Sequence, residues 1–387
     1  MYVTKVIEKV EDLEEVGYLF NSRSKRYITD LNFLKFWLTN PPKRKQNFFI
    51  LYSPEPESSG RLIVGRIFKK KLGIKFGYKN LFKFNTKCLE IFYEGILGDF
   101  SESQIADALL QLRRFIKKHK IDYAIFNSLR AGLPFYDWIK RNVNVFYRNL
   151  MPDIKDRWAL KMPGSFEEYF QQRSKNTKSN IRKWRNKMEK SFSGNYEIRC
   201  YKKGSDINKV LNDIEKVYSK AWKGGMGVGF SNTEEEYRHW SYFASCDWLR
   251  IYILYIKGEP VAHWSGVLYK RIFNLFTTDF DPEYQNYNPG FFLLINMIND
   301  FISAKEVDLY DFGLSGSHYK RLFCDLTYNE SDIFIFTQTV RGLMFSFLYN
   351  TSLFGNNLIK FVLIRLKILE KMKSLWRKAY TPRAARL

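Results

Sequence analysis

The stretch YNPGFFLLINMI, Tyr287–Ile298, decides how the second half of this chain is expected to fold. Proline is tolerated in the first turn of a helix because no intrahelical hydrogen bond is lost there. Glycine lacks a Cβ atom, so another group can come close to the backbone. Pro289 and Gly290 therefore predict a helix with approachable N–H groups at its start, which is a common anion site. Strand-like sequence precedes this helix at Arg271–Phe280 and follows it at Val307–Gly313.

The rest of the second half extends this pattern of strands and helices. Ser165 and Glu168 have the spacing of a capping box, at the start of a helix expected to run toward Lys190. Two strands are expected at 249–256 and 261–269, because the turn sequence KGEP separates two apolar runs there. This half therefore reads as one domain of alternating helices and strands.

The first half alternates in the same way, which indicates a second domain of the same type. Its expected strands lie at 47–53, 61–68, 88–100 and 121–128. Between the last two, a capped amphipathic helix is expected at 101–120, beginning at Ser101. We therefore predict an α/β protein whose mixed sheets are flanked by helices. The expected domains are 1–160 and 161–340, followed by a basic amphipathic helical tail at 341–387.

Composition limits the classes of partner. The formal net charge is +23 and the pI is about 9.6, so the chain attracts polyanions such as nucleic acid, anionic lipid or phosphorylated substrates. The four cysteines form no C-x-x-C pair and there are only four histidines, so no metal site is expected. The charged start lacks the apolar core of a signal peptide, and no run reaches the roughly 18 apolar residues of a spanning helix. A cytoplasmic location is the expectation.

Three segments together resemble a branch of the GNAT acetyltransferase superfamily. They are GEPVAHWSGVLY (258–269), YNPGFFLLINMI and VDLYDFGLSGSHYKRLF (307–323). That branch is typified by the cellulose-biosynthesis (CelD/BcsL-type) acetyltransferase domains and is related to the Fem peptidoglycan-bridge transferases. The resemblance covers 165–326 closely and the first half loosely, as a degenerate partner domain. It implies two GNAT-like domains and an acyltransferase that uses acetyl-CoA or another acyl-CoA.

The resemblance also implies where the coenzyme is held. Its most specific part is Asn288-Pro289-Gly290, with Asp311-Phe312-Gly313 and Tyr319-Lys320 downstream. Exposed amides at 290–293 are expected to hold the coenzyme A diphosphate. The expected cofactor-binding residues are Asn288, Pro289, Gly290, Phe291, Phe292 and Lys320. The alternative for Pro289-Gly290 is a tight strand-to-helix turn without a ligand.

Acyl transfer to an amine needs a deprotonated amine, a polarised carbonyl and a neutralised thiolate, and no covalent nucleophile. Tyr319 matches the tyrosine that protonates the thiolate in the wider superfamily, with core packing as its alternative. His263 is a general-base candidate because histidine titrates closest to neutrality, although packing is the alternative here too. Asp311, at the carboxyl end of a strand, is a second candidate base or a structural carboxylate that fixes the loop to Tyr319. Asp279 is a further general-base candidate, but it and Asp281 flank Phe280 before a proline, so the favoured role for both is to cap a turn.

Two basic segments indicate anionic partners. Arg173–Lys190 holds eight basic residues and one acid, with one apolar helical face, so it is either a solvated surface or a site for an anionic glycan, nucleotide sugar or tRNA. The tail from residue 356 is either a helix packed on its domain or an interfacial helix on anionic lipid, at the inner face of the membrane. The loop GGMGVGF, 224–230, follows a helix and not a strand, so a dinucleotide site fails its context test.

These observations together predict an acyl-CoA-dependent N-acyltransferase. The resemblance implies an amine acceptor, such as an amino sugar or glycan intermediate of envelope or exopolysaccharide synthesis. Two alternatives stay open: a Fem-like transferase that uses aminoacyl-tRNA, because the Q/R-x-x-G-x-G/A loop of many acetyltransferases is absent, and a non-catalytic basic binding protein on the same fold. No RNA-binding fold signature is present in the sequence, which counts against the tRNA alternative.

Overall fold

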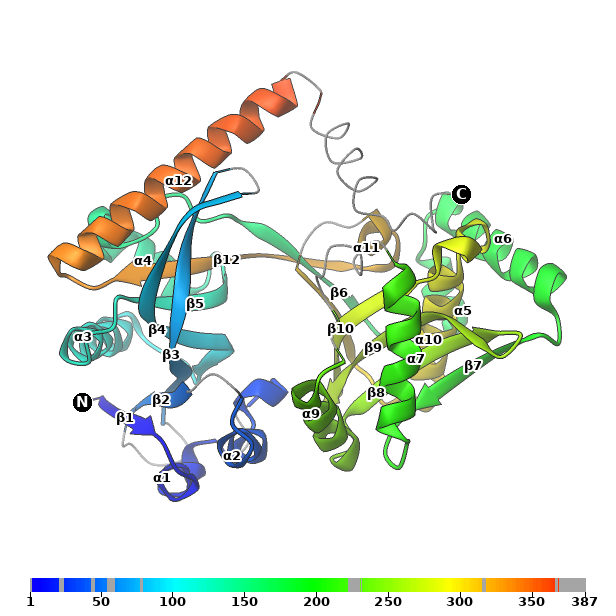
Figure 1. The fold of residues 1–387 in the computed structure, drawn as a ribbon, viewed down its shortest axis with the longest axis horizontal. Helices are drawn as coiled ribbons and strands as arrows, with labels where there is room; N and C mark the ends of the chain where they lie inside the picture. The colour runs from blue at the N-terminus through cyan, green and yellow to red at the C-terminus, as the bar shows by residue number, and fades with distance from the viewer. Residues whose placement is uncertain are drawn as a thin grey trace. The chain divides into compact units, whose positions relative to one another are not determined.

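The computed structural model describes residues 2–20, 24–42, 46–53, 60–76, 79–221, 230, 232–314, 318–365 and 368. The chain divides into two compact units (Figure 1). Unit 1 holds Met1–Asp156 and Tyr328–Leu369, and unit 2 holds Arg157–Thr327. Each unit contributes strands to one large mixed sheet, carries helices on the faces of its strands and contains one parallel strand pair, so the prediction of two α/β halves with mixed strands is confirmed.

Unit 1 has the strand order β1-β2-β3-β4-β5-β12, in which only β4 and β5 are parallel. The strands are β1 (Val3–Ile7), β2 (Gln46–Tyr52), β3 (Leu62–Phe76), β4 (Lys79–Leu97), β5 (Tyr123–Arg130) and β12 (Leu326–Phe336). The α-helices are α1 (Val10–Glu14), α2 (Leu31–Thr39), α3 (Glu102–Lys118), α4 (Pro134–Asn142) and α12 (Val340–Arg365).

Strand alternation in unit 1 fills two cores, one on each face of the sheet. In β2, Phe49 and Leu51 pack with α3 and α4, whereas Phe48 and Ile50 pack with α1 and α2. Helix α3 makes the crossover between the parallel strands, and its predicted cap at Ser101 forms as a capping box with Gln104.

Strands β3 and β4 are longer than the sequence predicts. The expected strands ended at Phe68 and began at Cys88, whereas the observed hairpin continues through the lysine-rich residues between them. Lysine is depleted in strands in general, so this extension carried no strand signal in the sequence.

Unit 2 has the strand order β6-β11-β10-β9-β8-β7, in which only β10 and β11 are parallel. The strands are β6 (Lys155–Lys161), β7 (Tyr196–Tyr201), β8 (Leu249–Ile256), β9 (Glu259–Tyr269), β10 (Ile272–Phe280) and β11 (Leu309–Leu314). The α-helices are α5 (Phe166–Gln171), α6 (Lys175–Phe192), α7 (Ile207–Lys220), α9 (Glu234–Ser245), α10 (Pro289–Ala304) and α11 (His318–Phe323).

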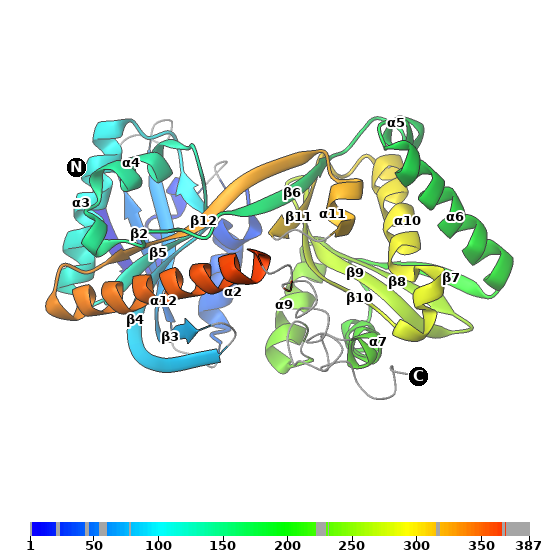
Figure 2. The same cartoon turned by 90° about the horizontal axis from the view of Figure 1, so that it is seen from above.

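The helices of unit 2 lie on both faces of its sheet. Figure 2 shows α5, α6 and α10 on one side of the strands and α7 and α9 on the other. The predicted hairpin between β8 and β9 is confirmed, with Lys257 and Gly258 both at positive φ in its turn. The single helix expected from Ser165 to Lys190 is wrong: it breaks into α5 and α6, because Ser174 caps α6 by accepting a hydrogen bond from Thr177 N at 3.2 Å.

The long apolar helices raise the question of membrane insertion. No helix in the described residues is both long and apolar enough to cross a bilayer.

Candidate active site

Strands β10 and β11 separate at their carboxyl ends. They pair over only three positions, which end at Asn274 and Asp311. Beyond these residues β10 continues beside β9 to Phe280, and β11 continues beside β6 to Leu314. Each strand has an irregular register at the point of divergence. The result is a wedge between two parallel strands, where an extended ligand can lie against backbone groups.

Helix α10 begins beside this wedge, as the Pro-Gly pair predicts. Asn288 precedes it in the left-handed conformation (φ 52°, ψ 52°), and Pro289 is its first residue. The N–H groups of Phe291 and Phe292 already donate to Asn288 O, at 3.1 and 3.0 Å. Since proline has no N–H, the Gly290 amide is the one left for a ligand in the described first turn. The expected set of free amides is therefore smaller than the sequence indicated.

Gly290 has no close neighbour on the side where a Cβ would be. The nearest atom to such a Cβ is Phe280 Cδ1 at 3.8 Å, an ordinary contact distance. The Gly290 carbonyl accepts a hydrogen bond from Trp264 Nε1 at 2.9 Å, which ties α10 to β9. The backbone at this corner is therefore both fixed in position and approachable.

The two aromatic residues that follow Gly290, Phe291 and Phe292, pack against the core of unit 2. Phe292 is buried, and Phe291 stacks on Trp184 with ring centroids 4.6 Å apart. These contacts hold the start of α10 against α6. Their side chains therefore help to fix the helix terminus.

Tyr319 lies on α11 against the aromatic lining of the wedge. Its ring packs edge-on against Trp264 at 5.7 Å and tilted against Phe312 at 6.3 Å. Burial raises the pKa of the Tyr319 phenol well above its usual value, and the charges of Cys324 and Asp279 add to this shift. The phenol therefore keeps its proton at neutral pH.

Lys320 follows Tyr319, and its ammonium group is hydrogen-bonded to the backbone at the end of β11. Its ammonium donates to Gly313 O at 3.2 Å and to Leu314 O at 2.7 Å. Burial lowers the pKa of Lys320 to about 8. In this arrangement Lys320 fixes the carboxyl end of β11, which forms one side of the wedge.

Asp311 forms a buried ion pair. Its two carboxylate oxygens accept from Arg157 Nη1 at 2.9 and 2.8 Å, and one also accepts from Gly313 N at 2.8 Å. The side chains of Asp311 and Arg157 are 3% and 12% exposed, so this pair joins β11 to β6 largely shielded from solvent. A carboxylate held in this way fixes the bulge that opens the wedge.

His263 and Asp279 are cross-strand neighbours in the interior of the sheet. The register places His263 of β9 directly opposite Asp279 of β10, and both side chains are buried. Directly opposed residues of an antiparallel pair point to the same face, with Cβ atoms about 5 Å apart. Ser265 Oγ lies 3.4 Å from His263 Nδ1. Sequence spacing alone could not reveal that this imidazole and this carboxylate lie opposite each other, because that depends on the β9–β10 register.

Asp281 performs the turn-capping that the sequence predicted for both aspartates. It accepts from Glu283 N at 3.0 Å at the start of the short helix Pro282–Tyr287, and pairs with Lys220 at 2.7 Å. Asp279 has no such place in a turn, so the prediction was right for Asp281 and wrong for Asp279.

The basic helix is α6, with the predicted apolar face. Ile181, Trp184 and Met188 are buried, and the basic side chains from Lys175 to Lys190 are exposed or half-buried. Arg173 is different from the rest, because it is buried and bonded to Asp325. The loop at 224–229 lies outside the described residues, and no cluster of potential metal ligands occurs in the part of the chain that is described.

Comparison with known proteins agrees with this architecture. Residues 175–321 match the family described as an acetyltransferase (GNAT) domain. The solved structure of FemX matches with a TM-score of 0.55 at 10% identity, covering 86% of this chain and 98% of that chain. A conserved protein of unknown function from Bacteroides thetaiotaomicron VPI-5482 matches with a TM-score of 0.52 at 12% identity, over 87% and 100% of the two chains.

A third structure is the C-terminal DUF2156 domain of a putative lysylphosphatidylglycerol synthetase from Agrobacterium fabrum. Its TM-score is 0.50 at 10% identity, over 89% of this chain and 96% of that chain. Identities this low show a shared fold and nothing about substrate. No protein in the curated comparison matches the chain.

The family match falls on the residues that build the wedge, from α6 to α11. This chain therefore carries a GNAT acetyltransferase domain in unit 2, and it is an acyltransferase of the GNAT fold. The expectation of an enzyme is confirmed, and the non-catalytic alternative is set aside.

Proposed function

We propose that unit 2 transfers an acyl group, in the first instance acetyl, from an acyl-CoA to an amine. The observation that carries this proposal is the wedge between β10 and β11, with the Pro-Gly start of α10 beside it. The residues fit a coenzyme with a diphosphate, because the Gly290 amide lies at a helix N-terminus and has room in front of it. Asn288 and Pro289 set the conformation that presents this amide.

The acid–base roles follow from burial and position. The proposed general acid is Tyr319, whose protonated phenol can give its proton to the sulfur as the carbon–sulfur bond breaks. The proposed base is the His263–Asp279 pair, which takes the proton that the amine nitrogen loses when it attacks the carbonyl carbon. Asp311 and Lys320 are positioning residues in this scheme, because both are bonded to the backbone of β11.

The acceptor is proposed from the resemblance to the CelD/BcsL-type domains and from charge. An amino sugar or an anionic glycan intermediate of envelope or polysaccharide synthesis would suit the exposed basic side chains of α6. A Fem-like transferase that uses aminoacyl-tRNA is the second candidate, because the sequence lacks the Q/R-x-x-G-x-G/A loop of many acetyltransferases.

Replacing Gly290 by valine tests the proposed coenzyme site. The Cβ of the new side chain comes no closer than 3.8 Å to Phe280 Cδ1, so the midpoint of thermal unfolding should stay within about 2 °C of the parent. A ligand diphosphate at the Gly290 amide would collide with it, so Kd for acetyl-CoA should rise by at least about tenfold. Isothermal titration calorimetry with acetyl-CoA measures this.

The control is Gly132→Val, at a surface turn with nothing within 4 Å of an added Cβ. Because Gly132 has φ +81°, this variant reports the loss of folding stability when a β-branched residue is forced into a left-handed turn. Its Kd for acetyl-CoA is expected to be unchanged. Unchanged acetyl-CoA binding by Gly290→Val would reject the site at α10. Saturable binding of charged tRNA together with no acetyl-CoA binding would favour the Fem-like alternative.

We also propose that α12, the described start of the tail, rests on an anionic bilayer. Its exposed apolar side chains fall on one arc about 100° wide, at the 100° per residue of an α-helix. They are Val340, Leu343, Met344, Phe347, Phe354, Leu358, Phe361 and Val362. The opposite side of α12 packs on β12 and β4 through Phe345 and Tyr349.

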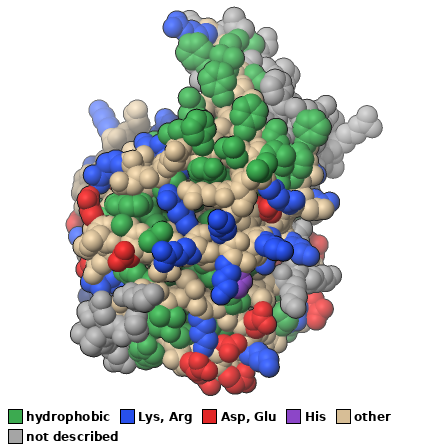
Figure 3. Space-filling view, turned by 90° about the vertical axis from the view of Figure 1, so that its left-hand side faces the viewer, with side chains coloured by type: hydrophobic (Ala, Val, Ile, Leu, Met, Phe, Trp, Pro, Cys, Tyr) green, Lys and Arg blue, Asp and Glu red, His purple; other side chains and the backbone are tan. Residues whose placement is uncertain are grey.

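A second exposed apolar segment adjoins this stripe. Asn350 of α12 accepts from Leu150 N at 2.8 Å and donates to Arg148 O at 3.0 Å, which places the segment at 145–154 beside the helix. Its exposed apolar residues are Val145, Phe146, Leu150, Met151 and Ile154. Figure 3 shows apolar side chains gathered along the projecting part of this face, with Lys and Arg below them. An apolar surface bordered by positive charge fits an anionic lipid surface.

Vesicle sedimentation tests the bilayer proposal. Burying one phenylalanine is worth about 1.5–3 kcal/mol, so Phe347→Asp with Phe354→Asp should lower the partition coefficient by at least about 100-fold. Both side chains are more than half exposed, so folding should be unaffected. The matched control is Tyr18→Asp with Leu110→Asp, which changes two exposed apolar residues of unit 1 outside the patch. Equal partitioning of the two double variants would exclude the bilayer as the partner of this surface. Concentration-dependent dimers of the parent protein that are lost only in the Phe347→Asp, Phe354→Asp variant would exclude it too.

A further inference from the structure

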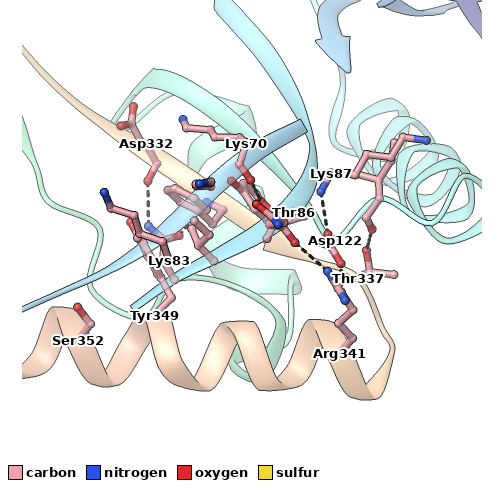
Figure 4. A pocket seen from close by; sticks show the side chains of 18 of the residues that line it. Lys70, Lys83, Thr86, Lys87, Asp122, Asp332, Thr337, Arg341, Tyr349 and Ser352 are labelled. Atoms are coloured by element: carbon pink, nitrogen blue, oxygen red, sulfur yellow. Dashed lines mark hydrogen bonds and ion pairs between the residues drawn. The ribbon is translucent and has the colours of Figure 1, made fainter. Parts of the chain in front are cut away.

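Unit 1 contains a groove of about 1600 Å³ with a basic lining (Figure 4). Strands β3 and β4 bound it on one side and α12 on the other, as Lys70, Lys83, Tyr349 and Ser352 show in the close-up. The lining includes three aspartates and nine basic residues, which are Lys69, Lys70, Lys71, Lys83, Lys87, Lys117, Lys120, Lys155 and Arg341. The groove therefore has a strong excess of positive charge.

The aspartates neutralise only part of this excess, because there are three of them against nine basic residues, and two pair with Arg341 and Lys155 of the lining itself. Asp122 accepts from Arg341 Nε at 2.6 Å and from Lys87 N at 2.8 Å. Asp332 accepts from Ser128 N at 2.9 Å, and Asp153 is an exposed residue paired with Lys155 at 3.4 Å. Among the described residues, no ion pair joins an acid to Lys69, Lys70, Lys71, Lys83, Lys117 or Lys120.

The strand register brings like charges together at one edge of the groove. Lys69 of β3 lies directly opposite Lys87 of β4, and like charges in opposed positions destabilise a sheet. Burial and the positive charges of Lys87 and Lys118 lower the pKa of the neighbouring His119. A bound anion would remove this repulsion, since lysine is a strong point-charge donor to phosphate.

The floor of the groove offers little for recognising a neutral sugar or a base. Thr86 Oγ1 donates to Lys70 O at 2.7 Å, and Asn149 Nδ2 donates to Asp332 O at 2.9 Å. The aromatic rings of Tyr123 and Phe334 are buried, which leaves the half-buried Tyr349 as the aromatic ring of the lining that can offer a face for stacking. Charge is therefore the main feature by which this groove can select a ligand.

We propose that the groove of unit 1 binds a ligand that carries two or more linked phosphate groups. The observation that carries the proposal is that lysines of β3, β4 and α3, which no ion pair joins to an acid among the described residues, line one space large enough for more than a single phosphate. A soluble nucleoside diphosphate derivative and a lipid-linked diphosphate share this chemistry. The site goes beyond the proposed acyl transfer and involves none of the residues assigned to it.

Calorimetric titration with inorganic tripolyphosphate tests the proposal directly. Lys69→Gln, Lys70→Gln and Lys83→Gln together should weaken tripolyphosphate binding by at least about tenfold, because three charge-assisted contacts are lost. All three side chains are exposed, so the thermal unfolding midpoint should not change. The matched control is Lys175→Gln, Lys183→Gln and Lys190→Gln on α6, which removes the same charge from unit 2 and should change Kd less than about twofold.

Competition then separates the two sources of the diphosphate. Displacement of tripolyphosphate by a nucleoside diphosphate supports a soluble ligand, and displacement only by phosphatidylcholine vesicles that contain a polyprenyl diphosphate supports a lipid-linked one. An equal loss of binding in the groove and α6 variants would mean unspecific attraction and would overturn the proposal. Binding of tRNA that tripolyphosphate does not displace would overturn it in favour of nucleic acid.

Discussion

Replacing Tyr319 by phenylalanine is expected to lower kcat for acetyl transfer by about 100-fold or more, with KM for acetyl-CoA nearly unchanged. The substitution removes one oxygen and keeps the ring contacts with Trp264 and Phe312. Burial keeps the phenol protonated at neutral pH, so its loss removes a proton donor that acts only as the thiolate forms. Release of free thiol, followed at saturating acetyl-CoA with an amine acceptor, measures the effect.

Tyr310→Phe is the matched control for this prediction. Tyr310 is buried in the same core, stacked on Phe312 at 3.8 Å, and the structure records no hydrogen-bond partner for its hydroxyl among the described residues. Its replacement should leave kcat within about twofold of the parent. A Tyr319→Phe enzyme as fast as the Tyr310→Phe enzyme would remove Tyr319 from the chemistry and leave it a core residue.

The base is separable from the acid by the pH dependence of the rate. Asp279→Asn should lower kcat/KM and move the acidic limb of its pH profile to lower pH. The reason is that the protonated imidazole of His263 loses an adjacent negative charge that stabilises it. An unchanged acidic limb would show that a group other than His263 accepts the proton of the amine.

Replacing Asp311 by alanine is expected to destabilise unit 2 by about 3–5 kcal/mol, because Arg157 would remain as a buried charge without its carboxylate. The free energy of unfolding from urea denaturation measures this loss. Exchanging both partners, Asp311→Leu with Arg157→Met, should recover most of it, since the double variant leaves no isolated charge.

Asp308→Ala provides the comparison on the same segment. Asp308 pairs with Arg271, but both side chains are more than half exposed, so the urea midpoint should be nearly unchanged. If Asp311→Ala kept full stability and yet abolished acetyl transfer, Asp311 would belong to the chemistry and its positioning role would be rejected.

Local patterns were enough to predict several elements of unit 2. Pro289 and Gly290 begin α10, the KGEP turn joins β8 and β9, and Asp281 caps the helix after β10. Each of these features depends on residues within a few positions of one another. Backbone conformation and capping are short-range effects, so one sequence is sufficient to reveal them.

Long-range pairing decided what local patterns could not. The sequence predicted Asp279 as a turn cap, but the register of β9 with β10 places it against His263. Arg173 belongs by sequence to the basic helix, yet it is buried on Asp325. The sequence predicted no element for the lysines between Phe68 and Cys88, whereas the structure pairs them in the β3–β4 hairpin that forms the wall of a groove.

The amino-acid sequence by itself determined the α/β class, the helix that begins at Pro289 and the acyltransferase resemblance. Only the tertiary structure decided that the Gly290 amide alone is left at that helix start, that Asp311 is held by Arg157, and that β12 with its helix α12 completes unit 1. The reason is physical: helix starts and turns are set by neighbouring residues, whereas strand register and buried charge pairs join residues that are far apart in the chain.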